Sequence, residues 1–168
     1  LDCPGNQLES LTLTGLDNLK TLLCYQNQLT TLDVSGLPAL KDLACYNNQL
    51  TTLTLRGASA LTSVGCDDNQ LTSLDASGLT NLTSLSCRRN GMETLTLSGA
   101  VNLTMLFCSD NPLHSLDLSG TTKLASLEMG NNAVTSYTDK NDHTLTIGAA
   151  ERGYSIIEQI YPAGNITL

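Results

Sequence analysis

Apolar residues recur along the chain with a period of 21 residues, separated by polar residues. In one representative unit, the alternation of Leu43 and Cys45 has the period of two that is expected of a β-strand. Leu50, Leu53 and Leu55 follow on a returning arm and are predicted to face the same interior. Each unit is therefore predicted to form one coil, with a short strand and a return arm.

Cysteine and asparagine mark the same period. The six cysteines are each 21 residues apart, at Cys3, Cys24, Cys45, Cys66, Cys87 and Cys108. An asparagine stands three residues after each, and Asn132 continues this series after Met129. Seven units are visible, and the first is truncated, because Leu1 occupies the second leucine position. We therefore expect residues upstream of Leu1.

Stacking is expected to supply the core, because one coil cannot bury its apolar side alone whereas stacked coils bury a continuous interior. Each fully buried leucine contributes about 1.5–3 kcal/mol. The recurring asparagine is predicted to hydrogen-bond backbone groups of neighbouring coils. A glycine that recurs at the bend of the return arm, such as Gly36 or Gly57, is predicted to have a positive φ or a close neighbour.

The repeat pattern divides the chain in two. Residues 1–144 are predicted to form the solenoid, and residues 145–168 a β-rich cap or the start of a following domain. In the cap, Leu145 and Ile147 would occupy the strand positions of one shortened, closing coil.

Composition limits the partners. The formal net charge of −8 repels phosphate backbones and leaves no basic stripe, so nucleic acid is excluded as a partner. No apolar run approaches the roughly 20 residues that a membrane-spanning helix needs, so we expect no direct membrane insertion of this segment. We expect a monomer.

The cysteines have three interpretations. Buried interior residues are favoured, because free cysteine behaves as a small hydrophobe. Disulfides are the second interpretation. They are less favoured because the parallel Cβ vectors in neighbouring coils hold the Cβ atoms farther apart than a disulfide bridge prefers. Zinc comes last, because a straight ladder never converges on one ion and His114 and His143 are distant. We expect no metal, no cofactor and no enzymatic activity, since no histidine base is paired with a nucleophile or carboxylate.

The string Leu-x-x-Leu-x-Cys-x-x-Asn-x-Leu-x-x-Leu-Asp, as in Leu103 to Asp117, resembles the cysteine-ladder repeats of internalin-like bacterial surface proteins. This resemblance implies a leucine-rich-repeat solenoid, a right-handed superhelix with few or no long helices. It would carry a parallel β-sheet on its concave face and an irregular or short-turn convex face. The resemblance also implies an extracellular or cell-surface protein of a bacterium that binds a protein or glycan.

Candidate contact residues follow from the period, which assigns the outward side chains of each strand. Aromatic residues and arginine often anchor interfaces. The candidates on the sheet face are Leu23, Tyr25, Tyr46, Asp67, Arg88, Met105 and Phe107. An equally weighted alternative is structural: Tyr25 and Tyr46 pair across strands, and the Asp and Arg residues pair across coils.

The sequence therefore predicts a recognition or adhesion module that binds its ligand through the concave β-face. The alternative is a structural spacer or stalk of a larger surface protein, without a ligand of its own. The two differ in one respect: a spacer has no use for aromatic side chains on the sheet face.

Overall fold

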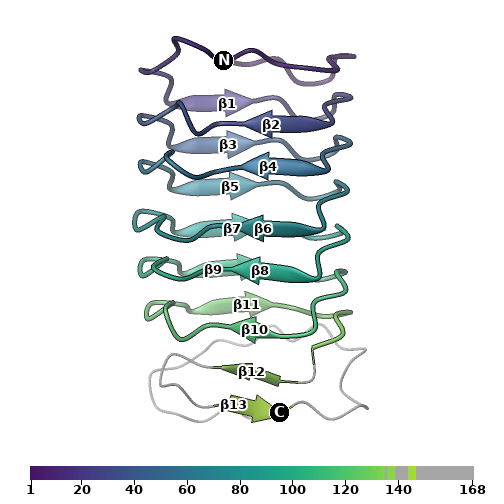
Figure 1. Ribbon diagram of the computed structural model, residues 1–168, viewed down its shortest axis with the longest axis vertical. Helices are drawn as coiled ribbons and strands as arrows, with labels where there is room; N and C mark the ends of the chain where they lie inside the picture. Colours follow the sequence, from purple (N-terminus) through teal and green to yellow (C-terminus); the bar gives the residue numbers. More distant parts are fainter. Residues whose placement is uncertain (135, 139–143, 147–168) are drawn as a thin grey trace.

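The computed structural model describes residues 1–134, 136–138 and 144–146. Successive coils stack along one long axis, with the first coil at one end and the last described strands at the other (Figure 1). None of the described residues lies in a helix, so this part of the chain offers no helical segment suited to crossing a membrane. The predicted solenoid is confirmed.

One side of the stack is a six-stranded parallel sheet in the order β1-β3-β5-β7-β9-β11. Its strands are Thr21–Leu23 (β1), Asp42–Ala44 (β3), Ser63–Gly65 (β5), Ser84–Ser86 (β7), Met105–Phe107 (β9) and Ser126–Glu128 (β11). Paired residues are 21 apart throughout, as in Leu22 with Leu43. The central side chain of each strand points inward and is buried. The period in the sequence is thus the register of the sheet.

The return arm forms short strands as well, which adds order to the side predicted to be irregular. These strands are Thr31–Asp33 (β2), Thr52–Thr54 (β4), Ser73–Asp75 (β6), Thr94–Thr96 (β8), Leu116–Asp117 (β10), Ser136–Thr138 (β12) and Thr144–Thr146 (β13). They pair as β2-β4, β6-β8 and β10-β12-β13. Threonine flanks an inward leucine in several of them, and β-branched residues on both sides of a buried residue favour extended backbone.

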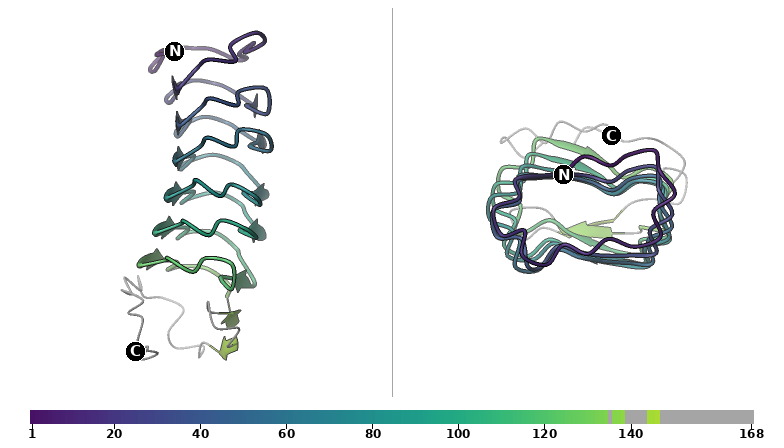
Figure 2. Two further views of the ribbon diagram at one scale, coloured as in Figure 1. Left: turned by 90° about the vertical axis from the view of Figure 1, so that its left-hand side faces the viewer. Right: turned by 90° about the horizontal axis from the view of Figure 1, so that it is seen from above.

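The core lies between these two series of strands. Viewed along the stack, each coil is a flattened ring whose two long sides carry the strands (Figure 2). Leucine fills the ring from both sides; Leu22, Leu40 and Leu50 have no exposed surface. Apolar burial of this kind supplies the main driving force for stacking.

The asparagines form a hydrogen-bonded ladder, as predicted. The Asn48 amide donates to the carbonyl oxygens of Cys24 and Cys45, both at 3.0 Å. Its Oδ1 accepts from the Leu29 backbone N–H, also at 3.0 Å. From Asn27 onward, each asparagine of the series therefore connects its own coil to the preceding one through backbone groups that are at least partly shielded from water.

The cysteine ladder is interior and reduced, which confirms the favoured interpretation. All six thiols are free; five are fully buried, and Cys3 is half-buried in the first coil. Burial disfavours the thiolate and raises the pKa of Cys24 and Cys108 to about 12. The same cause raises the pKa of Cys45, Cys66 and Cys87.

The repeat changes direction after β12. This strand is parallel to β10, but β13 is antiparallel to β12 and pairs Leu145 with Tyr137. A closing coil at Leu145, as expected from the sequence, would have required a parallel strand on the opposite side. Five residues separate β12 from β13, whereas eight separate β2 from β3, and the shorter connection joins neighbouring antiparallel strands. The other half of that expectation, Ile147, lies outside the described residues, and residues 148–168 do as well.

The bend glycines differ from one another, and one matched pair gives a direct test. A Cβ at Gly57, whose φ is +98°, would lie 2.6 Å from the Ser35 carbonyl oxygen, whereas a Cβ at Gly36 would meet nothing within 4 Å. We expect Gly57→Ala to lower the free energy of unfolding by about 1–3 kcal/mol. Gly36→Ala should be neutral or stabilising by up to about 1 kcal/mol. Urea unfolding of both variants measures the difference, and equal effects would show that the bend is not strained at Gly57.

Candidate functional site

The candidate site is the outer surface of the six-stranded sheet, here called the six-stranded face. Two rows of residues run across it, one residue from each coil, and all of them except Ser109 and Gly130 are partly exposed. The first row is Leu23, Ala44, Gly65, Ser86, Phe107 and Glu128, and the second row is Tyr25, Tyr46, Asp67, Arg88, Ser109 and Gly130. Six of the seven candidates predicted from the sequence stand in these rows. Met105 begins strand β9 beside them, with 41% of its surface exposed.

The tyrosines of the second row stack on each other. The ring centroids of Tyr25 and Tyr46 are 4.5 Å apart, and the planes differ by 10°. Both side chains are half-buried. Such a pair contributes about 0.5–1.5 kcal/mol beyond the area it buries. The stack also covers one face of each ring.

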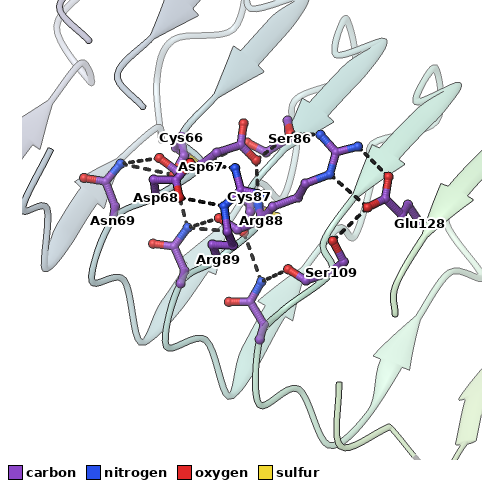
Figure 3. A network of polar contacts seen from close by, with 12 residues as sticks. Cys66, Asp67, Asp68, Asn69, Ser86, Cys87, Arg88, Arg89, Ser109 and Glu128 are labelled. Atoms are coloured by element: carbon purple, nitrogen blue, oxygen red, sulfur yellow. Dashed lines mark hydrogen bonds and ion pairs between the residues drawn. The ribbon is translucent and has the colours of Figure 1, made fainter. Parts of the chain in front are cut away.

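Arg88 forms a second cluster, toward the other end of the face. Its guanidinium carbon lies 4.4 Å from the centroid of the Phe107 ring, in the next coil. Its Nε donates to Oε1 of Glu128, one coil further, at 3.1 Å. Ser109 donates its hydroxyl to the same oxygen at 2.8 Å. Figure 3 shows Arg88 extended along the face toward Glu128. One side chain thereby connects three coils.

The charges of this cluster stabilise each other. The Arg88 guanidinium hydrogen-bonds Glu128 and lowers the pKa of that carboxyl, while Glu128 raises the pKa of Arg88. The two side chains keep 28% and 20% of their surface exposed. Partial burial reduces screening by solvent, and the ring beneath the guanidinium adds a cation–π contact. Arg88 is therefore held in one place and is not a freely moving surface cation.

Asp67 is fixed in a different way, through the next coil. Its Oδ1 accepts hydrogen bonds from the Arg88 backbone N–H and from the Ser86 hydroxyl, both at 2.7 Å. Beside it, Asp68 accepts from Nε and Nη2 of Arg89 at 2.6 and 2.7 Å. Arg89 lowers the pKa of Asp68. The Arg88 guanidinium pairs with Glu128, and its Nη1 also donates at 3.3 Å to the Ser86 hydroxyl that bonds Asp67.

The candidates do not form one cluster. Leu23 and the tyrosine pair lie at the N-terminal half of the face, and Arg88 with Phe107 lies at the C-terminal half. Leu23 and Met105 lie in β1 and β9, with β3, β5 and β7 between them. The contacts also agree with the structural alternative, because Tyr25 pairs with Tyr46 and Arg89 pairs with Asp68 across coils.

Sequence reasoning missed Glu128, the main partner of Arg88. The signal was present, since Glu128 lies 21 residues after Phe107 and therefore in the same row. Pairing was expected between neighbouring coils, but the arginine side chain is long enough to reach over Phe107 to the second coil. Ser86 and Ser109 were missed as well, because a serine in an outward row has no distinctive pattern.

In the described part of the chain, no three His, Cys, Asp or Glu side chains come together around a possible metal ion. The cysteines face the core, and His114 is exposed on the return side.

Comparison with known proteins agrees with this geometry. Residues 17–57 match the sequence family described as Leucine Rich repeats (2 copies). Among solved structures, the functional domain of InlJ from Listeria monocytogenes, which includes a cysteine ladder, is similar with a TM-score of 0.56 and 24% identity. The similarity covers 82% of this chain and 40% of that one, so the present chain spans less than half of the Listeria structure. No curated protein matches.

The chain has the fold of a leucine-rich-repeat solenoid. The similarity at 24% identity concerns the fold, and it includes the cysteine ladder that the 21-residue period predicts. Repeat solenoids present an extended surface along the stack, and the six-stranded face is such a surface here. The fold by itself does not specify a function.

Proposed function

We propose that this leucine-rich-repeat solenoid is a recognition or adhesion module that binds a protein or glycan through its six-stranded face. It would act as a monomer, outside a bacterial cell or at its surface. The face exposes an extended row of aromatic, apolar and charged side chains on a rigid sheet. Such side chains supply much of the contact energy at interfaces.

The observation that carries this proposal is the contrast between the two faces of the solenoid. On the return side, the outward residues repeat with little change: Thr31, Asp33, Thr52, Thr54, Ser73, Asp75, Thr94, Thr96 and Asp117. On the six-stranded face, every coil carries a different combination. A position that serves only the fold needs no different side chain in each coil. The variation therefore favours ligand contact on the six-stranded face.

A spacer function is the second candidate, and the internal contacts favour it. The tyrosine pair and the Arg88–Phe107–Glu128 cluster satisfy one another within the chain. Such contacts would also serve a protein that only separates neighbouring domains.

The experiment is a screen of the purified chain against panels of host proteins and glycans, repeated with the double variant Tyr46→Ala/Phe107→Ala. We expect the double variant to lose the ligand but to remain folded, with a urea midpoint lowered only by the loss of the tyrosine stack and of the Arg88–Phe107 contact, because both side chains lie outside the core. Thr52→Ala/Thr94→Ala on the return side serves as the matched control and should bind normally. Equal binding by all three proteins, or no binding by any of them, would favour the spacer.

A further inference from the structure

The middle of the six-stranded face has open space above the backbone. Gly65 stands in the first row, between Ala44 and Ser86, and has no side chain. A Cβ placed there would have two near neighbours, Cδ1 of Tyr46 at 3.9 Å and the Leu43 carbonyl oxygen at 4.0 Å. These are ordinary contact distances, so the backbone at Gly65 would accept a side chain. The space is therefore available to a group from another molecule.

The ring of Tyr46 borders this space. Tyr25 covers the ring face that looks toward the first coils, in a nearly parallel stack. The ring edge of Tyr46, at Cδ1, is the nearest side-chain group to a Cβ placed at Gly65. One wall of the space is therefore apolar, and the aliphatic stem of a long side chain can pack against it.

Asp67 supplies the second wall. It follows Tyr46 in the second row, and its carbonyl oxygen accepts the Asn47 N–H at 3.0 Å, which holds the two coils together there. Two donors fix Oδ1, and the described residues contribute no hydrogen bond to Oδ2. A carboxylate that is already ordered costs little further entropy when it binds. Asp67 is thus a preorganised acceptor.

Within the described part of the chain, no arginine forms an ion pair with this carboxylate. Arg88 pairs with Glu128 and Arg89 with Asp68, and Arg88 reaches Asp67 only through the Ser86 hydroxyl. The net charge of −8 adds an attractive field for a basic partner over longer range. Charge complementarity with Asp67 therefore favours a positively charged group at this position.

We infer that the six-stranded face docks a polypeptide segment that places a lysine or arginine side chain over Gly65, between the Tyr46 ring and the Asp67 carboxylate. This inference rests on the proposed recognition function and names the chemistry of the partner. The aliphatic stem of that side chain would cover Gly65, and its charged end would reach Oδ2 of Asp67.

The test uses a phage library of short random peptides, selected on the purified chain and counter-selected on Gly65→Leu. Leucine is tolerated at this position of the repeat, because Leu23 occupies it in the first coil. We expect selected peptides to share a basic residue at one fixed position. A synthetic peptide with this residue changed to glutamine should bind at least about tenfold more weakly.

Point variants then locate the peptide. Asp67→Asn retains an oxygen for both hydrogen bonds while it removes the charge, and we expect at least about a tenfold loss of affinity. The matched control is the triple variant Asp33→Asn/Asp75→Asn/Asp117→Asn. It removes three carboxylates from the return side, each of which accepts from a nearby serine N–H. Peptide affinity should fall only slightly in the triple variant, through its weaker long-range field, and much less than in Asp67→Asn.

The possible failures are distinct. Neutral or acidic peptides that bind the wild type and not Gly65→Leu would overturn the cation assignment and leave the recognition function standing. A glycan that binds the wild type and Asp67→Asn but not Gly65→Leu would also overturn the cation assignment and leave the recognition function standing. Basic peptides weakened only by the triple variant would show unspecific charge attraction. Peptides that ignore every change on the six-stranded face would contradict both the inference and the proposed function.

Discussion

Raising the pH from about 8 to about 11 is expected to unfold this protein through the ionisation of its buried thiols. In the folded state burial raises the pKa of Cys24, Cys45, Cys66, Cys87 and Cys108. In the unfolded chain each thiol titrates near its ordinary value of about 8.5. Above that pH the unfolded state binds fewer protons than the folded state, so stability falls as the pH rises.

The dependence should be unusually steep. Each protected thiol lowers the free energy of unfolding by about 1.4 kcal/mol per pH unit, and five together give about 7 kcal/mol per unit. A domain of ordinary stability, about 5–15 kcal/mol, would therefore unfold between about pH 9 and about pH 11. Urea titrations followed by circular dichroism at several pH values, in the presence of a reductant, measure the slope.

Alanine variants test how many of the buried thiols cause this pH dependence. Cys66→Ala should reduce the slope by one fifth, and Cys45→Ala/Cys87→Ala should reduce it by two fifths. A change in overall stability from the smaller side chain shifts the curve without changing its slope. If the slope is the same in all three proteins, the cysteine ladder is not the cause of alkaline unfolding.

The sequence predicted the parts of the fold that follow from the period. Because Leu43 and Cys45 alternate and every unit has the same length, the inward and outward sides of each strand could be assigned before the structure was known. The hydrogen bonds of Asn48 to its own and the preceding coil followed from the same reasoning. These features are local or repeat between adjacent coils, so the sequence pattern determines them.

Features that depend on how far a long side chain extends, or on the length of the segment between two strands, were not predictable in this way. The Arg88–Glu128 pair spans two coils because of the length of one side chain, and no repeat position encodes that choice. Gly36 and Gly57 occupy the same repeat position but differ in φ. The reversal at β13 depends on a short connection in the last coil. The binding role of the candidate residues also remains a prediction, because their partners within the chain do not determine a ligand.

Stability and the proposed recognition therefore depend largely on different positions of the same repeat. The cysteine, asparagine and inward leucine positions keep one residue type in nearly every coil and hold the stack together. The two outward rows can change without loss of the core, and there the coils differ. A change in an inward position should consequently lower the free energy of unfolding, whereas most changes in an outward row should lower it less.

Asn69→Ala is expected to be among the most destabilising single substitutions, at about 3–5 kcal/mol. The Asn69 Oδ1 accepts the Leu50 N–H at 2.9 Å, and Nδ2 donates to three carbonyl oxygens at 3.1 Å, those of Cys45, Cys66 and Asp67. Alanine provides none of these bonds. The free energy of unfolding from urea titrations at neutral pH measures the loss.

The neighbouring asparagines compensate for only part of this loss. Asn48 also donates to the Cys45 carbonyl, and Asn90 also donates to the Cys66 carbonyl, so both oxygens keep one donor. The buried Leu50 N–H loses its one acceptor in the ladder, and an unsatisfied buried donor costs about 1–3 kcal/mol by itself. Gln70→Ala, at the exposed adjacent position, is the control and should change stability by less than about 0.5 kcal/mol. Similar losses in both variants would mean that leucine packing alone holds the coils together and that the asparagine ladder is dispensable.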